Sequence, residues 1–409
     1  MNNNCSHYSP CCPSGLPFPL RPQVPQVPDL TILTGTGAPT NSIGSIGNVY
    51  IDLSTGNLYY KVQQPTPPGV RSIPSFTGTT HHVGIIQPDP YKTIQTAIDA
   101  ATTQNGDILI LDDPAYTTST TITVTKSLTI QGHDPLNPAA TTITMVAPGA
   151  LVMMEITAPS VVLKDMKIVQ PLIQSDNAVN IELNNHTATG YYINNCEISS
   201  CEVGIGVNVA EFQITGCTFT YAGVAGNNYR YISIHFTSGA SIINGNSFVS
   251  ASQDSACYFV AVTNLTGTIT GKLLVSNNEQ TIALFKLRHL FDMEEFNAND
   301  FQLFINNNTT ISENNVPILL NAPALGIFRF IEVIGNHVMN SVGKGLIGID
   351  VSYTGTTNIY ASGNVLANPS FTAPWASATV PPSPDVGYRS SVMTNPSLPL
   401  ATGYWLPLI

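Results

Sequence analysis

Six ionisable residues crowd into positions 286–295 of a chain that otherwise carries little charge. They are Lys286, Arg288, His289, Asp292, Glu294 and Glu295. Elimination in an acidic polysaccharide needs a base, often Arg or Lys, and carboxylates that hold Ca²⁺ against the sugar acid. The candidate catalytic residues are therefore Arg288, Asp292, Glu294 and Glu295. The alternative, a solvated loop with local ion pairs, is the one that the sequence favours.

The seven cysteines form two groups. Three lie in a proline-rich tail (Cys5, Cys11 and Cys12), and four lie further along (Cys196, Cys201, Cys217 and Cys257). The tail cysteines can form inter-chain bridges in an oxidising setting. Cys196 and Cys217 occupy equivalent positions of neighbouring repeats, so we expect stacked small hydrophobes, with a disulfide as the less favoured alternative.

Neither cysteines nor histidines have the spacing of a metal site. His7 is the nitrogen ligand nearest to the tail cysteines, and their adjacent pair lacks zinc spacing. His81 and His82 have no further ligands close in sequence, so we expect both to be solvated. We predict no metal and no cofactor.

Composition excludes some function classes. The chain has 409 residues, of which 10% are charged, with a net charge of −11. Ordinary globular proteins have about 25% charged residues. The basic footprint of a nucleic-acid-binding protein is absent, and so is an apolar run long enough to span a membrane. We expect neither nucleic acid nor membrane as a partner.

A short phrase recurs through residues 194–368. Asn195-Cys196-Glu197, Gly216-Cys217-Thr218, Gly245-Asn246-Ser247 and Gly335-Asn336-His337 are examples. With key positions at 195, 216, 246, 278, 308, 336 and 364, the steps are 21, 30, 32, 30, 28 and 28. A loose repeat of ~20–50 residues is typical of stacked repeat architectures.

The repeats read as strands. Apolar and polar residues alternate around each phrase, and Asn or Gly supplies the tight turn. Stacked coils would place each such Asn roughly 4.8 Å from the next, which predicts an asparagine ladder. We therefore predict an all-β parallel β-helix. The alternative, an antiparallel β-sandwich, would favour turns every ~8–12 residues.

Residues 90–132 add a resemblance. We predict a short amphipathic helix over 90–101, which contains Thr93-Ile94-Gln95-Thr96-Ala97-Ile98. Its apolar face holds Ile94, Ala97, Ile98 and Ala101. Gly106-Asp107-Ile108-Leu109 and Lys126-Ser127-Leu128-Thr129-Ile130 follow. This order resembles the first coil of the pectin-lyase-like superfamily. The resemblance implies a right-handed parallel β-helix of nine or ten coils over 107–368, with a capping helix before it.

Residues 34–64 carry a second resemblance. Val49-Tyr50-Ile51-Asp52 and Leu58-Tyr59-Tyr60-Lys61 flank a turn and predict a hairpin. This segment resembles small modules of phage tail fibres, giant-virus fibre proteins and bacterial collagen-like surface proteins, which implies surface display. The predicted segments are an anchor arm (1–33), this module (34–64), a linker (65–88), the capped β-helix (89–368) and a C-terminal wrap rich in proline and aromatic residues (369–409).

Three function classes remain. The favoured hypothesis is a structural or adhesive protein on a virion surface, with a spore, cell or extracellular surface as the alternative. We expect a homotrimer whose arm contacts other particle-surface proteins. The competing hypothesis is a carbohydrate-active enzyme, either a lyase or a hydrolase. The third is a glycan-binding module, with Tyr229, Tyr231 and Phe236 as candidate glycan contacts.

Overall fold

The structure is a computed structural model that divides the chain into two units, residues 1–69 and residues 70–409. It describes residues 32–35, 49–52, 58–60, 77–146, 151–170, 178–200, 202–221, 229–250, 257–263, 268–280, 289–294, 297–311, 318–321, 327–339, 347–349, 358–367 and 388–394. The five segments predicted from the sequence stay predictions. The division between the units falls inside the predicted linker.

Within the first unit, three strands form one sheet: β1 (Ile32–Gly35), β2 (Val49–Asp52) and β3 (Leu58–Tyr60). β2 and β3 are antiparallel, with Tyr50 opposite Tyr59, as the hairpin prediction requires. β1 lies parallel to β2 and was not expected. The likeness of this unit to fibre modules stays a prediction.

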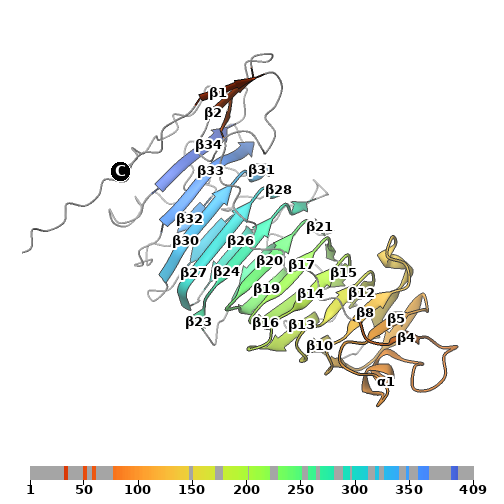
Figure 1. Ribbon diagram of the computed structural model, residues 1–409. Helices are drawn as coiled ribbons and strands as arrows, with labels where there is room; N and C mark the ends of the chain where they lie inside the picture. Colours follow the sequence, from red (N-terminus) through yellow and green to blue (C-terminus); the bar gives the residue numbers. More distant parts are fainter. Residues whose placement is uncertain are drawn as a thin grey trace, which may run out of the picture. The chain divides into compact units, whose positions relative to one another are not determined.

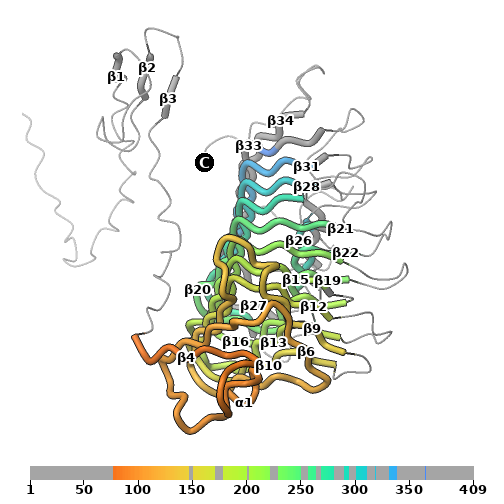
Figure 2. Tube along the Cα trace, turned by 90° about the vertical axis from the view of Figure 1, so that its right-hand side faces the viewer, coloured from red at the N-terminus to blue at the C-terminus, as the bar shows by residue number. Residues whose placement is uncertain are grey.

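The second unit is a right-handed parallel β-helix, which confirms the predicted fold class. Each coil contributes one strand to each of three faces, and equivalent strands of successive coils pair in parallel (Figures 1 and 2). The right-handed sense is that of nearly all parallel crossovers.

The nine-stranded sheet forms one face. Its strands are β7 (Ile122–Val124), β10 (Val152–Ile156), β13 (Val179–Asn185), β16 (Val203–Val209), β19 (Tyr229–Phe236), β22 (Cys257–Val262), β26 (His289–Glu294), β29 (Ile318–Asn321) and β32 (Ile347–Ile349). Eight full turns separate its first strand from its ninth. This is slightly fewer than the nine or ten coils predicted, because loops between the strands lengthen several turns.

The other two faces share a 22-stranded sheet. One face contains β4 (Thr80–Val83), β5 (Ile108–Leu111), β8 (Thr129–Gly132), β11 (Val162–Lys164), β14 (Tyr191–Asn194), β17 (Phe212–Thr215), β20 (Ala240–Asn244), β24 (Lys272–Ser276), β27 (Asn297–Asn306), β30 (Ile327–Ile334) and β33 (Asn358–Ala367). The other contains β6 (Ala115–Thr118), β9 (Thr142–Met145), β12 (Lys167–Val169), β15 (Glu197–Ser200), β18 (Thr218–Tyr221), β21 (Ser247–Ser250), β25 (Glu279–Gln280), β28 (Thr309–Ile311) and β31 (His337–Met339). Two further elements are β23 (Thr268–Ile269), which pairs with β27, and the short 3-10 helix η1 (Pro138–Ala140).

Aliphatic side chains fill the interior, one column per strand position. Ile181, Ile205 and Ile232 are register partners on β13, β16 and β19, and all three are fully buried. Alternate residues along a strand point to opposite sides, so the residue between two such positions faces outward. Tyr229 and Tyr231 lie inside as well, with ring centroids 4.6 Å apart and an interplanar angle of 89°.

The predicted asparagine ladder is confirmed along one inner corner. The side-chain amide Nδ2 of Asn246 donates to Asn278 Oδ1 at 2.9 Å, and the link repeats through Asn308, Asn336 and Asn364 at 2.8, 2.9 and 3.0 Å. Each ladder oxygen also accepts from the backbone N–H of the preceding ladder residue. All five side chains are buried.

Two of the predicted key positions are wrong by one residue. Asn195 and Gly216 have positive φ angles of 50° and 63° and form the turn, whereas the ladder slot of their coils holds Cys196 and Cys217. Both cysteines are buried free thiols, as the stacking prediction requires. A hydrogen bond to Cys217 and burial raise the pKa of the Cys196 thiol. The tail cysteines lie outside the described residues.

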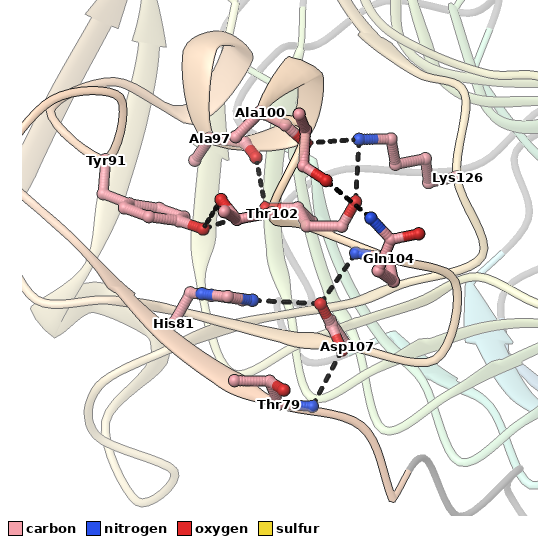
Figure 3. A network of polar contacts seen from close by, with 11 residues as sticks. Thr79, His81, Tyr91, Ala97, Ala100, Thr102, Gln104, Asp107 and Lys126 are labelled. Atoms are coloured by element: carbon pink, nitrogen blue, oxygen red, sulfur yellow. Dashed lines mark hydrogen bonds and ion pairs between the residues drawn. The ribbon is translucent and has the colours of Figure 1, made fainter.

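The capping helix is α1 (Ile94–Asp99), shorter than the predicted 90–101. Thr93 caps its first turn by accepting from the Thr96 N–H. Ile94, Ala97 and Ile98 are buried as predicted, but the helix ends before Ala101, which is exposed. Lys126 Nζ donates to the carbonyls of Ala100 and Thr103 at 2.8 and 2.9 Å, just beyond the helix (Figure 3).

Residues 80–83, inside the segment predicted as a linker, form the strand β4. β4 pairs in parallel with β5, so His81 is held rather than solvated. Its Nε2 lies 2.9 Å from Asp107 Oδ2, and its ring stacks on Tyr91 (Figure 3). Asp107 also accepts from the backbone N–H groups of Thr79 and Gln104. The prediction missed this strand because prolines and serines precede it.

At the other end, β34 (Tyr388–Thr394) pairs in parallel with β33. A strand from the predicted C-terminal wrap therefore lies along the last strand edge, where unpaired backbone groups would otherwise invite another chain. The rest of segment 369–409 lies outside the described residues.

The ladder makes a strong prediction for stability. Asn308→Ala removes the oxygen that accepts from the backbone N–H and from Nδ2 of Asn278. The buried backbone N–H then has no acceptor, and Nδ2 keeps only its hydrogen bond to the Ile243 carbonyl oxygen. We expect a loss of about 2–5 kcal/mol, measured by denaturant unfolding. The matched control is Asn307→Gly, an exposed turn position with φ of 56°, where glycine costs little. Equal losses in both variants would contradict the prediction.

Candidate functional site

Polar side chains gather on the outer side of the nine-stranded sheet, over the consecutive strands β10, β13, β16 and β19. Each lies next to core residues along its strand and therefore faces outward. We call this set the polar face. Its members are Glu155, Glu182, Asn184, Asn208, Ser233 and His235.

Two carboxyl groups of the polar face are neighbours. Glu155 and Glu182 are register partners on adjacent strands, roughly 4.8 Å apart along the backbone. Burial raises the pKa of Glu182 to about 7, and the negative charge of Glu155 adds to this rise. Asn184 Nδ2 donates to Glu155 Oε1 at 3.0 Å. The pair can thus hold one proton near neutral pH.

Gly206 gives the Glu182 carboxyl its room. Gly206 is the register partner of Glu182 on β16, and a Cβ atom there would collide with Glu182 Oε2. The carboxyl therefore lies over β16, next to the position of Ser233 on β19. Alanine at this position would displace it.

His235 lies between a backbone carbonyl oxygen and a hydroxyl group. His235 Nδ1 is 3.1 Å from the Thr263 carbonyl oxygen, and its Nε2 is 3.5 Å from Ser233 Oγ. Ser233 Oγ lies 3.4 Å from Thr263 Oγ1. Burial lowers the pKa of His235, and this outweighs the hydrogen bond to Thr263.

Aromatic rings border the polar face. His186 is exposed and stacks on the half-buried Phe236, with ring centroids 5.0 Å apart and an interplanar angle of 15°. Beside them, Asn208 Nδ2 donates to Asn184 Oδ1 at 3.3 Å, so side-chain amides of two strands form a row. Flat rings next to amides suit a ligand with apolar faces and hydroxyl edges.

Among the described residues, no group of three or more His, Cys, Asp or Glu side chains could hold a metal ion. The same part of the chain contains no helix that is long and apolar enough to cross a membrane.

The candidate residues from the sequence lie elsewhere. Asp292 occupies the same outward column as Glu182, but four strands away on β26, about 19 Å along the sheet. It is 2% exposed. Glu294 ends β26, so this part of the expected loop is a strand. Lys286, Arg288 and Glu295 lie outside the described residues, and a catalytic role for Arg288, Asp292, Glu294 and Glu295 stays a prediction.

Among the candidate glycan contacts, Tyr229 and Tyr231 were wrong. Their side chains are 1% and 0% exposed, because they fill the interior beside Phe219, Phe248 and Phe259. Phe236 does reach the surface, next to His186.

Sequence reasoning missed Glu155, Glu182, Ser233 and His235. For the first three, the signal is a repeated triplet of one residue between two aliphatic ones. The triplets are Met154-Glu155-Ile156, Ile181-Glu182-Leu183, Ile205-Gly206-Val207 and Ile232-Ser233-Ile234. Aligning these triplets would have placed the middle residues in one outward column.

Comparison with solved structures shows the fold alone. ORF18 of Geobacillus virus E2 is similar with a TM-score of 0.52 and 15% identity, covering 86% of this chain and 71% of that one. Pectate lyase Pel9A is similar with a TM-score of 0.47 and 12% identity, covering 80% of this chain and 82% of that one. Pectin methylesterase PemA from Erwinia chrysanthemi is similar with a TM-score of 0.39 and 13% identity, covering 76% of this chain and 92% of that one. No family model and no curated protein matches the chain.

The shared proton predicts a pH-dependent stability. The folded pKa of Glu182, about 7, exceeds its ordinary value of 4.5, so its stabilising contribution is complete below pH 4.5 and is lost as the pH rises through 7. Glu182→Gln avoids this loss. We expect the variant to gain on the order of 1–2 kcal/mol over the parent at pH 8 and nothing at pH 4, measured by denaturant unfolding.

Glu197→Gln is the matched control. Glu197 lies 3.1 Å from Lys167 Nζ, so its removal should give no gain at pH 8. If the free energy of unfolding of the parent and of Glu182→Gln depended on pH in the same way, the raised pKa of Glu182 would be disproved.

Proposed function

We propose that this chain is a structural or adhesive protein of a virion or fibre surface, and that its polar face contacts glycans. The observation that carries the glycan part is the His186–Phe236 ring stack beside the amides of Asn184 and Asn208. The apolar face of a sugar ring packs on an aromatic ring, while its hydroxyl groups bond to amides and carboxylates.

The arrangement of the polar face supports a ligand that extends across several coils. Parallel strands repeat roughly every 4.8 Å, so outward side chains form a row along the solenoid. Within the described residues, Asn208 Oδ1 is buried and accepts no hydrogen bond, so a sugar hydroxyl can satisfy it once the Asn208 side chain turns outward. His186 and Asn184 are exposed and can meet a ligand without rearrangement.

Several observations support surface display. A solenoid with few charges presents a regular outer surface while its coils cover one another's interior. The same fold occurs in ORF18 of Geobacillus virus E2. The first-unit hairpin and the proline-rich arm before it are consistent with attachment to other particle-surface proteins. We extend the proposal to a homotrimer, which a native mass measurement tests.

The competing class, a polysaccharide lyase or hydrolase, rests on the charged segment at 286–295. Of its members, Asp292 is described as a buried residue with Ala261 and Leu319 as register partners. Replacing Arg288 by Ala and assaying acidic polysaccharides separates this class from binding alone. Depolymerisation that depends on Arg288 would favour the enzyme.

The glycan proposal predicts a localised loss of binding. Phe236→Ala and His186→Ala each remove one ring of the stack, and we expect at least a tenfold weaker dissociation constant for a glycan found by array screening. Such a change corresponds to about 1.4 kcal/mol or more. Calorimetry with the full chain measures it.

Leu136→Ala is the control for this experiment, because Leu136 is 93% exposed and lies outside the nine-stranded sheet. Its affinity should equal that of the parent. Binding that survives both ring substitutions would refute the polar face as the contact.

Display has its own test. Mass spectrometry of purified particles against soluble fractions should find the chain enriched on the particles. Equal abundance in the soluble fraction would argue against display, whatever the outcome of the glycan experiment.

A further inference from the structure

We infer that the polar face also hydrolyses ester-linked acyl groups, with Ser233 Oγ as the nucleophile and His235 as the base. The assignment of a glycan as the molecule that carries the acyl group rests on the proposed function. The assignment of Ser233 and His235 as nucleophile and base does not. Three observations carry the inference: the tautomer of His235, the backbone bulge that aims it, and the space beside Ser233.

The hydrogen bond to Thr263 fixes the tautomer of His235. A backbone carbonyl can only accept, so Nδ1, which lies 3.1 Å from it, carries the hydrogen. The lone pair of the neutral ring then resides on Nε2, which faces Ser233 Oγ at 3.5 Å. A nucleophile, a base and a group that orients the base form the arrangement of serine hydrolases, and such contacts are often long without substrate.

A β-bulge aims the ring. Val207 pairs with Ile234 and Asn208 pairs with Phe236, so His235 is the extra residue of β19 opposite β16. Ser233 faces outward, and in a regular strand the residue two positions on, His235, faces the same side. The bulge changes the angle at which the His235 side chain leaves the strand. Bulges are frequent beside active sites for this reason, because they re-aim one side chain at a local cost in pairing.

The ionisation of His235 suits a base. Burial and the nearby positive charge of Arg230 lower its pKa, so the ring is neutral at pH 7. The two strands that flank β19, β16 and β22, carry no Asp, Glu, Lys or Arg; the titratable groups of β22 are Cys257 and Tyr258. Farther along the face are Glu182 and Glu155 on one side and Asp292 on the other.

Small residues leave space beside the nucleophile. The register partners of Ser233 are Gly206 and Ala261, and the Glu182 carboxyl occupies the space over Gly206. Ser233 is 1% exposed, so neighbouring side chains must move before an acyl group reaches its Oγ. The protonated form of Glu182 can then donate a hydrogen bond to the oxygen that becomes negatively charged.

The chemistry balances without a further reagent. Ser233 Oγ attacks the acyl carbonyl carbon while its proton passes to His235 Nε2; the bond to the alcohol oxygen breaks, and that oxygen takes the proton from Nε2. Water then attacks the acyl-serine and gives a proton to Nε2. Ser233 Oγ leaves with that proton, and the free carboxylic acid is released.

The test uses a fluorophosphonate probe and p-nitrophenyl acetate on the full chain. We expect covalent labelling at Ser233, found by peptide mass spectrometry, and slow ester hydrolysis. Ser233→Ala should abolish labelling, and His235→Gln should slow it at least 100-fold with an unchanged melting temperature. Leu136→Ala, at a 93% exposed position outside the nine-stranded sheet, is the control and should keep the labelling rate of the parent.

The pH profile gives a readout that a structural role would not produce. Labelling should fall on acidification with a midpoint below 6.5, because His235 must be neutral. A chain that is labelled at Ser233 but binds no arrayed glycan would keep this inference and reject the glycan part of the proposed function, so the two can fail separately. Absence of labelling in the parent chain, or labelling that persists in Ser233→Ala, would overturn the inference.

Discussion

The buried column of side-chain amides is the constraint on which the solenoid depends. In this column, the Nδ2 of each asparagine donates to the Oδ1 of the asparagine one coil further along, at 2.8–3.0 Å. Its members are Asn246, Asn278, Asn308, Asn336 and Asn364. An amide buried without partners costs about 1–3 kcal/mol per unsatisfied group. Slipping one coil against the next would break several of these bonds together, so the ladder fixes the register of every sheet it borders.

The ladder also explains the change of chemistry along that corner. In the coils of β15 and β18 the slot holds Cys196 and Cys217, which pack as small apolar groups. The first ladder oxygen, Asn246 Oδ1, accepts the backbone N–H of Cys217 at 2.9 Å, so the two halves join without an unsatisfied donor. Parallel strands pair through their backbones on both sides of this junction, and from Asn246 onward the column of buried side-chain amides adds a further set of hydrogen bonds between coils.

Much of this fold could be predicted from the sequence, because strand alternation and the recurring turn are local. The ladder slot was misplaced at residues 195 and 216, since Asn and Gly suit the turn and the slot equally well by residue type. β4 was missed because its pairing with β5 lies 28 residues away and its own residues, Thr80-His81-His82-Val83, carry a weak strand pattern.

The candidate site was harder to predict for a related reason. Glu155, Glu182 and Ser233 lie 27 and 51 residues apart in sequence and meet through register alone, while loops of unequal length separate their strands. Local charge density instead pointed to residues 286–295, where Asp292 turns out to be a buried strand residue. Sequence proximity identifies clusters within a loop, but a parallel sheet builds its surface from residues one coil apart.

The inner column of the nine-stranded sheet consists of apolar side chains, whereas the outer column contains two neighbouring carboxyl groups, and this difference bears on function. The inner column holds Ile181, Ile205 and Ile232, which packing alone accounts for. The outer column places two carboxyl groups side by side and raises the pKa of Glu182 to about 7, an arrangement that costs stability at neutral pH. Local choices that oppose stability concentrate at functional sites. A lysine beside the two carboxyl groups would relieve the repulsion between Glu155 and Glu182. The face keeps this repulsion and places a histidine at a β-bulge nearby, and both features favour a ligand-binding role over a purely structural one.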